Sequence, residues 1–141
     1  MIVYKATCRR GENTVSWNKG IPGPTTLTYS RNTLTVPDPV FKTYQYGLCV
    51  FNSYEQCQGF IFDNYRGENI KDAVVIYECL VIGNSRITNL PIRVVSIDLR
   101  DLHNQLMQRF KTYQPYSLLA WPEDTVMVDG LIPLRKLPLH V

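Results

Sequence analysis

Glu78 is the residue whose surroundings most suggest chemistry. It lies within residues 73–82 (AVVIYECLVI), a run that is apolar on both of its alternating faces. A carboxylate in such a strand is costly to bury unless it is paired or solvated. We expect a structural ion pair with Arg86 or Arg93. If Glu78 instead lines a cleft, desolvation raises its pKa, and it then serves as a general base or binds a ribose hydroxyl.

Tyrosines and basic residues occur together in two further places. Tyr65 and Arg66 share a polar loop, and Arg109, Lys111 and Tyr113 follow one another at the end of an expected helix. Rings stack on bases and Arg binds phosphates with two hydrogen bonds, so these groups suit a nucleotide pocket. The alternative is that tyrosines fill a small core and keep their hydroxyls wet. The candidate ligand-binding residues are therefore Tyr65, Arg66, Glu78, Arg109, Lys111 and Tyr113.

Several common chemistries lose their main support in this sequence. It contains no GxxxxGK[ST], GxGxxG, HExxH or GxSxG motif. His103 has no carboxylate neighbour on its expected helix face, which favours a solvent-facing side chain over a metal ligand. No cysteine pair has CxxC spacing, and we expect reduced, structural thiols. We predict no catalytic residue, metal or cofactor; the cysteines are Cys8, Cys49, Cys57 and Cys79.

The net charge of +3 is modest, and the basic residues are spread along the chain. The tightest groups are Arg9-Arg10, Arg109 with Lys111, and Arg135-Lys136, which we interpret as solvated edges rather than a phosphate track. Nucleic acid is therefore not an expected partner. No basic region followed by an apolar stretch opens the chain, and no apolar run approaches the roughly 20 residues that span a bilayer. We expect a cytoplasmic protein without membrane contact.

The elements that must position these residues are mostly strands. At 141 residues the chain has the size of one domain, residues 1–141. Alternation predicts strands over 2–8, 14–17, 47–51, 73–82, 92–97, 125–128 and 131–134, with Asp129-Gly130 as a turn or bulge between the last two. The run at 73–82 is typical of a central strand covered on both faces. Residues 25–29 and 33–36 predict a hairpin around Ser30-Arg31-Asn32.

Two helices complete the expected fold. Asp98 caps a helix at about 99–111, because Leu99, Leu102, Leu106 and Phe110 recur on one face. Ser53 and Gln56 have the spacing of a capping box, which predicts a short helix after Ser53, ending by Gly59 or continuing toward Phe62. The predicted class is α+β: a mostly antiparallel sheet with the amphipathic helix packed on one face.

The order of these segments resembles a known group of proteins. The segments are "VYKA", "GLCVFNSYEQCQGF", "AVVIYECLVIG" and "WPEDTVMVDGLIPLRKL". Together they resemble small accessory proteins of phages and large DNA viruses, including the phage anti-Thoeris proteins that sequester cyclic ADP-ribose-type signals. The resemblance covers most of the chain and is one of order and texture. It implies a non-catalytic nucleotide-binding protein.

Three functional hypotheses follow. The first is a viral or phage accessory protein, acting as an oligomer in the host cytoplasm. It would sequester a small nucleotide-type signal through Arg and Tyr side chains and so counter host defence. The second is a small ADP-ribosyltransferase-like enzyme that uses Glu78 as its carboxylate. The third is an interaction module that blocks a host defence protein through an exposed sheet edge or through the Gly/Pro-rich residues 18–24.

Overall fold

The computed structural model describes residues 1–17, 27–37, 39, 47–65, 67–86 and 125–140. These residues form a mixed fold in which every strand pairing is antiparallel, so the α+β expectation is confirmed. The elements, in chain order, are β1 (Ile2–Arg10), β2 (Asn13–Ser16), β3 (Thr28–Tyr29), β4 (Leu48–Phe51), α2 (Tyr54–Asn64), α3 (Ile70–Ala73), β5 (Val74–Arg86) and β6 (Thr125–Leu137).

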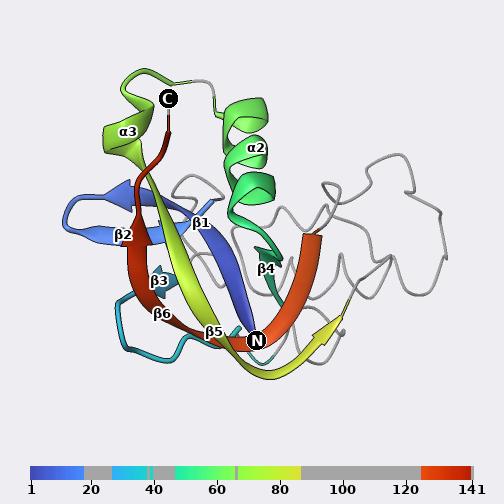
Figure 1. Cartoon of the computed structure of the whole chain (residues 1–141). Coiled ribbons are helices and arrows are strands. Elements are labelled where there is room, and N and C mark those ends of the chain that lie inside the picture. The colour runs from blue at the N-terminus through green and yellow to red at the C-terminus, as the bar shows by residue number, and fades with distance from the viewer. Residues whose placement is uncertain (18–26, 38, 40–46, 66, 87–124, 141) are drawn as a thin grey trace, which may run out of the picture.

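Four of the strands close into a small barrel. β1 pairs with β5, β5 with β6 and β6 with β4, and β4 returns to β1. The closing seam is short, because β4 and β1 share a single register pair, Tyr4 opposite Phe51. Further along β1, the same edge pairs with β2, which pairs in turn with β3. β2 and β3 thus extend the sheet outward from strand β1 of the barrel (Figure 1).

Alternation along β5 explains its central place. Val75, Tyr77 and Cys79 point into the barrel, while Val74 and Ile76 point outward to the helices. Both faces are buried over residues 74–77, because one faces the barrel interior and the other faces the helices. The prediction of two covered faces holds for this part of residues 73–82, whereas Ile82 is 38% exposed. The barrel interior is otherwise aliphatic, and its buried members on the other strands include Val3, Leu48, Val50, Val126, Val128 and Leu131.

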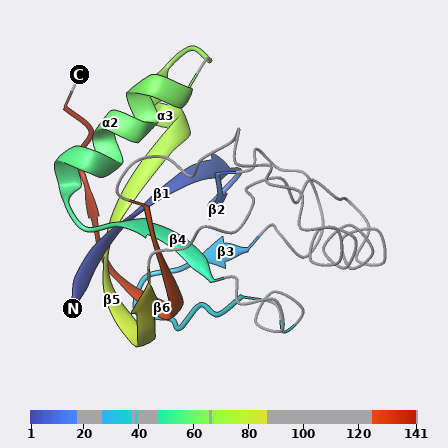
Figure 2. The ribbon, with the colours of Figure 1, turned by 90° about the vertical axis from the view of Figure 1, so that its right-hand side faces the viewer.

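Helix α2 covers one outer face of the barrel. It packs on β1 and β4, and Cys57 and Ile61 bury their side chains in that contact. Both views place α2 and α3 at the same end of the strands (Figures 1 and 2). The predicted start is confirmed, since Ser53 Oγ accepts from the Gln56 N–H at 3.1 Å. The helix continues past Gly59 and Phe62 to Asn64.

Replacing the helix cap tests this boundary. Ser53→Ala removes the acceptor for the Gln56 N–H and should lower the free energy of unfolding by about 1 kcal/mol. Urea denaturation of the two proteins measures the difference. Ser53→Asp restores an acceptor and should recover most of the loss; equal stability of all three proteins would contradict the assigned cap.

Two predictions near the ends of strands are wrong in part. In the described part, residues 27–29 and 33–36 do not form a hairpin with each other: Tyr29 pairs with Thr14 on β2, and Thr35 exchanges both backbone hydrogen bonds with Leu131 on β6. Residues 125–128 and 131–134 are one continuous strand. The register with β5 shifts between Ile82 and Ser85, where β5 has two residues, Gly83 and Asn84, opposite Asp129 alone. The bulge therefore lies on β5, and 129–130 is not a turn.

The expected helix at about 99–111 and the strand at 92–97 lie outside the described residues. So do residues 18–24.

A strip of apolar side chains lies on the outer face of the sheet, beyond Glu78, and belongs to the described residues. Ile2 and Ile82 are 39% and 38% exposed, and Leu34 and Val36 flank the backbone of Gly130 opposite Ile82. Among the described elements, none covers this strip.

Candidate ligand-binding face

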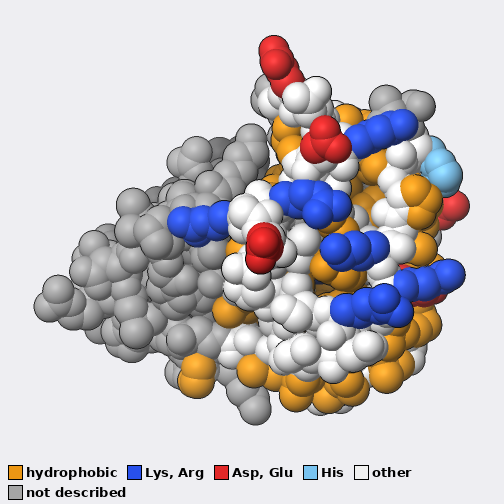
Figure 3. Space-filling model, turned by 90° about the vertical axis from the view of Figure 1, so that its left-hand side faces the viewer, with side chains coloured by type: hydrophobic (Ala, Val, Ile, Leu, Met, Phe, Trp, Pro, Cys, Tyr) orange, Lys and Arg blue, Asp and Glu red, His pale blue; other side chains and the backbone are white. Residues whose placement is uncertain are grey.

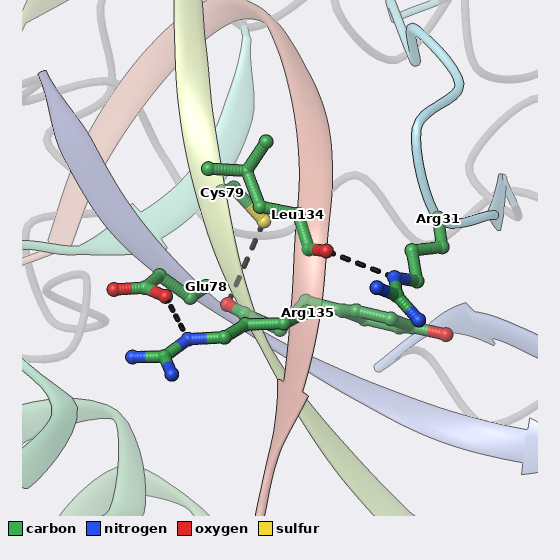
Figure 4. Close-up of polar contacts among 6 residues, drawn as sticks. Arg31, Glu78, Cys79, Leu134 and Arg135 are labelled. Atoms are coloured by element: carbon green, nitrogen blue, oxygen red, sulfur yellow. Dashed lines mark hydrogen bonds and ion pairs between the residues drawn. The ribbon is translucent and has the colours of Figure 1, made fainter.

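Glu78 is paired, but with a partner that the sequence did not indicate. Its carboxylate receives the Arg135 Nε hydrogen bond from the neighbouring strand β6 (Figure 4). The register of the ladder sets Glu78 opposite Arg135, so the two side chains share one face of the sheet. The hydrogen bond and charge of Glu78 raise the pKa of Arg135. The expectation of a structural ion pair is confirmed with Arg135 as the partner. The expected partners cannot be compared with it, because Arg93 and the side chain of Arg86 lie outside the described residues.

Tyr65 lies at the end of helix α2, and its contacts are those of a residue that stabilises the fold. Its backbone N–H bonds Ile61 O, its hydroxyl donates to Glu68 O at 2.6 Å, and its ring lies 6.5 Å from that of Trp17. Tyr4, which faces Glu78 across the β1–β5 ladder, packs instead on Tyr54 at the first turn of α2. Tyr65 and Glu78 thus lie toward opposite ends of a helix about 16 Å long. The structure does not bring them together.

The other candidate residues lie outside the described residues: Arg66, Arg109, Lys111 and Tyr113. The predicted pocket of tyrosines and basic groups is therefore represented only by two separated members. A different arrangement of basic groups does emerge, built from residues that the pocket prediction left out.

Basic side chains gather on one side of the molecule. The β1–β2 hairpin, α3, the turn after β3 and the end of β6 all lie on the left in Figure 1. Figure 3 faces that side and shows Lys and Arg side chains following one another across it. We call this the basic face; its exposed members on these elements are Arg9, Arg10, Arg31, Lys71, Arg135 and Lys136. Among the side chains that the structure describes, every exposed Lys or Arg belongs to it.

Backbone register positions the lower part of this face. Arg31 Nε donates to Leu134 O at 3.0 Å, which ties the turn after β3 to the strand that carries Arg135 (Figure 4). Leu134 is the extra residue of a bulge, because Glu78 pairs with Arg135 and Cys79 with Pro133. A bulge turns neighbouring side chains. Figure 4 shows the two guanidinium groups on opposite sides of β6: Arg135 turns toward Glu78, whereas Arg31 contacts the Leu134 carbonyl, 103 residues away in the sequence.

Among the described side chains, the elements of the basic face are more positive than the rest. The elements of the basic face carry six basic groups and four carboxylates, Glu12, Glu68, Asp72 and Glu78, which is a balance of +2. The remaining described side chains of these types are Lys5, Glu55, Asp63 and Asp129, with a balance of −2. Anions are therefore attracted to the basic face in preference to the rest of the described surface.

Lys5 is a buried cation that the sequence analysis missed. Its side chain points into the barrel and is 7% exposed. Nζ donates to Cys49 O at 2.8 Å across the β1–β4 seam and lies 5.3 Å from the centre of the Tyr29 ring. Burial opposes the charge, but the Tyr29 and Cys49 side chains favour it, and the pKa of Lys5 lies above its ordinary value. Lys5 is thus an ammonium at neutral pH, with no ion pair among the described residues.

The four cysteines are free thiols. Burial raises the pKa of Cys57 to about 12 and that of Cys79 to about 12, although Lys5 opposes both shifts. Burial also raises the pKa of Cys49. A protonated thiol is a poor nucleophile and a poor metal ligand. In the described part of the chain, no three His, Cys, Asp or Glu side chains are grouped to hold a metal ion.

No protein-family model, curated protein or solved structure matches this chain. Across the described residues, none of the helices is both long enough and apolar enough to cross a membrane.

Proposed function

We propose that the protein binds, without catalysis, a phosphate-bearing ligand of the nucleotide type on its basic face. The observation that carries this proposal is the gathering of Arg31, Arg135 and Lys136 with the basic groups of the β1–β2 hairpin and α3. Guanidinium and ammonium groups form charge-assisted hydrogen bonds to phosphate oxygens, and Arg binds two oxygens at once. A group of such residues attracts anions over a wider area than any one of them.

Binding is better supported than catalysis. The ADP-ribosyltransferase-like alternative needs the Glu78 carboxylate to face its substrate, but Arg135 holds that carboxylate on the outer sheet. The thiols whose pKa is raised are protonated at neutral pH. A narrower form of the proposal is that the protein sequesters a signal of the cyclic ADP-ribose type and thereby counters host defence. Its support is the resemblance of segment order to phage accessory proteins, and the diphosphate of such a signal would suit adjacent basic residues.

A thermal-shift experiment tests the proposal with a panel of mononucleotides, dinucleotides and cyclic nucleotides. A ligand present at 100 times its dissociation constant should raise the unfolding free energy by about 2.7 kcal/mol. Arg31→Gln removes one charge from the face and should weaken binding about tenfold, the loss of one charge-assisted contact. The control is Asn52→Asp, which changes the net charge equally at an exposed residue next to the cap of α2.

Absence of a shift with every nucleotide, or equal weakening by Arg31→Gln and Asn52→Asp, would contradict binding at the basic face. Mass spectrometry of the small molecules released from the denatured protein identifies a ligand that co-purifies. Hydrolysis of a nucleotide by the parent protein, or transfer of a group from it, would support the enzyme alternative.

A further inference from the structure

We infer that a second copy of this chain packs on the outer face of the sheet, so that the protein forms a weak dimer with two-fold symmetry. The contact surface is the apolar strip, a set of aliphatic side chains on the face of β5 that also carries Glu78. This inference does not depend on the proposed function. The members of the apolar strip are Ile2, Leu34, Val36, Leu80, Ile82 and Ile132.

The first row of the apolar strip crosses four segments of the chain. Ile2 lies opposite Leu80 on β5, and Leu80 lies opposite Ile132 on β6. The antiparallel bridge between residues 34–36 and β6 continues this row to Leu34. The residues next to these along the strands belong to the barrel interior. Because successive side chains of a strand point to opposite faces, the row points outward.

The second row lies two residues further along β5. Ile82 is opposite Gly130, and a Cβ at Gly130 would meet Val36 at 3.2 Å and Leu34 at 3.4 Å. These two side chains therefore lie over the glycine and join the rows into one surface. Leu34 and Val36 nevertheless remain 52% and 53% exposed. The strip lies at the end of the sheet near the N-terminus, whereas α2 and α3 lie at the other end (Figure 1).

The composition of the apolar strip favours a copy of the same chain as its partner. In a two-fold dimer the same patch of each subunit meets itself. Such interfaces are more apolar than those between independent proteins, and the obligate ones resemble a domain core cut in half. The strip consists of branched aliphatic side chains, as does most of the barrel core. Trp, Tyr and Arg, which anchor many contacts between unrelated proteins, are not among its members.

The charged groups at the rim of the apolar strip also suit a two-fold partner. Glu78 and Arg135 follow the first row along β5 and β6 and neutralise each other. Beyond the second row, the Asp129 carboxylate accepts the Asn84 N–H at 3.0 Å. The rim therefore carries both signs of charge around an uncharged centre. A rotated copy can place unlike charges opposite one another, which a rim of one sign would prevent.

The size of the surface predicts a weak dimer. Three steps of about 4.8 Å between strands, and six residues of about 3.4 Å from Glu78 to Asn84, give a patch roughly 20 Å wide and long with its side chains. This is on the order of 400 Å² as a flat area, about half of the 800 Å² that each partner of a standard interface contributes. We therefore expect a dissociation constant on the order of 10 to 100 μM.

Sedimentation equilibrium of the full chain, from about 2 to 500 μM, tests the inference over the range in which a weak dimer forms. The average mass should rise from 16.3 kDa toward twice that value. Val36→Lys should raise the dissociation constant at least tenfold, because each dimer carries the change twice. Phe62→Lys is the matched control, since Phe62 is an exposed apolar residue of α2, and should leave the dissociation constant unchanged.

Circular dichroism and urea denaturation establish that the variants fold. Leu34→Gln, a smaller change in the first row, should weaken dimerisation at least threefold and replaces Val36→Lys if that variant unfolds. Equal weakening by Val36→Lys and Phe62→Lys would overturn the assignment to the apolar strip. A parent protein that is monomeric at every concentration would overturn the dimer. In a monomer, destabilisation by Val36→Lys would indicate that another segment of this chain covers the strip, and unchanged stability would leave it to a different partner.

Discussion

Gly47→Ala is expected to lower the free energy of unfolding by about 3 kcal/mol. A Cβ atom at this position would stand 2.5 Å from the backbone oxygen of Val128 and 3.1 Å from its carbonyl carbon. Both atoms belong to β6, which pairs with β4 from Leu48 onward and cannot withdraw without breaking that ladder. Forcing a carbon atom into a packed site commonly costs about 1 to 3 kcal/mol, and more when backbone must move.

Gly59→Ala is the matched control, because it makes the same chemical change in open space. Gly59 lies inside α2, and a Cβ there would meet nothing within 4 Å. Ala in a helix interior is more favourable than Gly by roughly 0.5 to 1 kcal/mol, so this variant should be stabilised. Urea denaturation of both variants measures the two signs. Equal effects, or a stable Gly47→Ala, would contradict the close approach of β4 to β6.

Alternation and capping patterns predicted the elements that can be recognised without knowing which segments they pair with. The alternation in residues 2–8, 47–51 and 73–82 indicated β1, β4 and the doubly buried β5, because period two places apolar side chains on a face wherever the strand docks. Ser53 and Gln56 predicted the start of α2. Its end was less evident, since Gly59 is a poor helix residue. Burial of Ile61 extends the helix beyond it.

Pairing between distant segments could not be predicted in this way. Residues 33–36 are strand-like, but alternation does not say that Thr35 bonds Leu131 rather than Tyr29. The same limit applies to the partner of Glu78. A single register between β5 and β6 selects Arg135, 57 residues away, and nothing in the local sequence distinguishes it from Arg86 or Arg93. The basic face is likewise a product of register.

Lys5 had a local signal that could have been found. It occupies the same face of β1 as Val3 and Thr7, both fully buried, so period two already places its side chain among core residues. A lysine in such a position is rare, and its ammonium group is expected to donate a hydrogen bond inside the protein. The sequence does not show, however, that the acceptor of the Lys5 ammonium is Cys49 O on β4.

Lys5→Met is expected to lower the free energy of unfolding by about 1 to 3 kcal/mol, the cost of a buried carbonyl without a donor. β1 and β4 share only one register pair, so Lys5 Nζ supplies a hydrogen bond where the backbone ladder supplies few. Met keeps the length of the side chain and its apolar stem, and removes the charge and its donors. The loss of the contact with the Tyr29 ring acts in the same direction.

The sign of the stability change in Lys5→Met shows whether the buried ammonium stabilises or destabilises the fold. Lys136→Met, at an exposed residue of β6, is the control and should change the free energy of unfolding by no more than about 0.5 kcal/mol. The folded pKa of Lys5 lies above the ordinary 10.5, so its favourable contacts are fully present below that pH and are lost only as pH rises through the folded pKa. Urea denaturation at about pH 6 and pH 9 should give the same loss of stability for Lys5→Met.

A Lys5→Met variant as stable as the parent, or more stable, would mean that the free-energy cost of burying the ammonium exceeds the stabilisation from its contacts, as it does for some buried charges. In that case Lys5 would not hold the barrel closed.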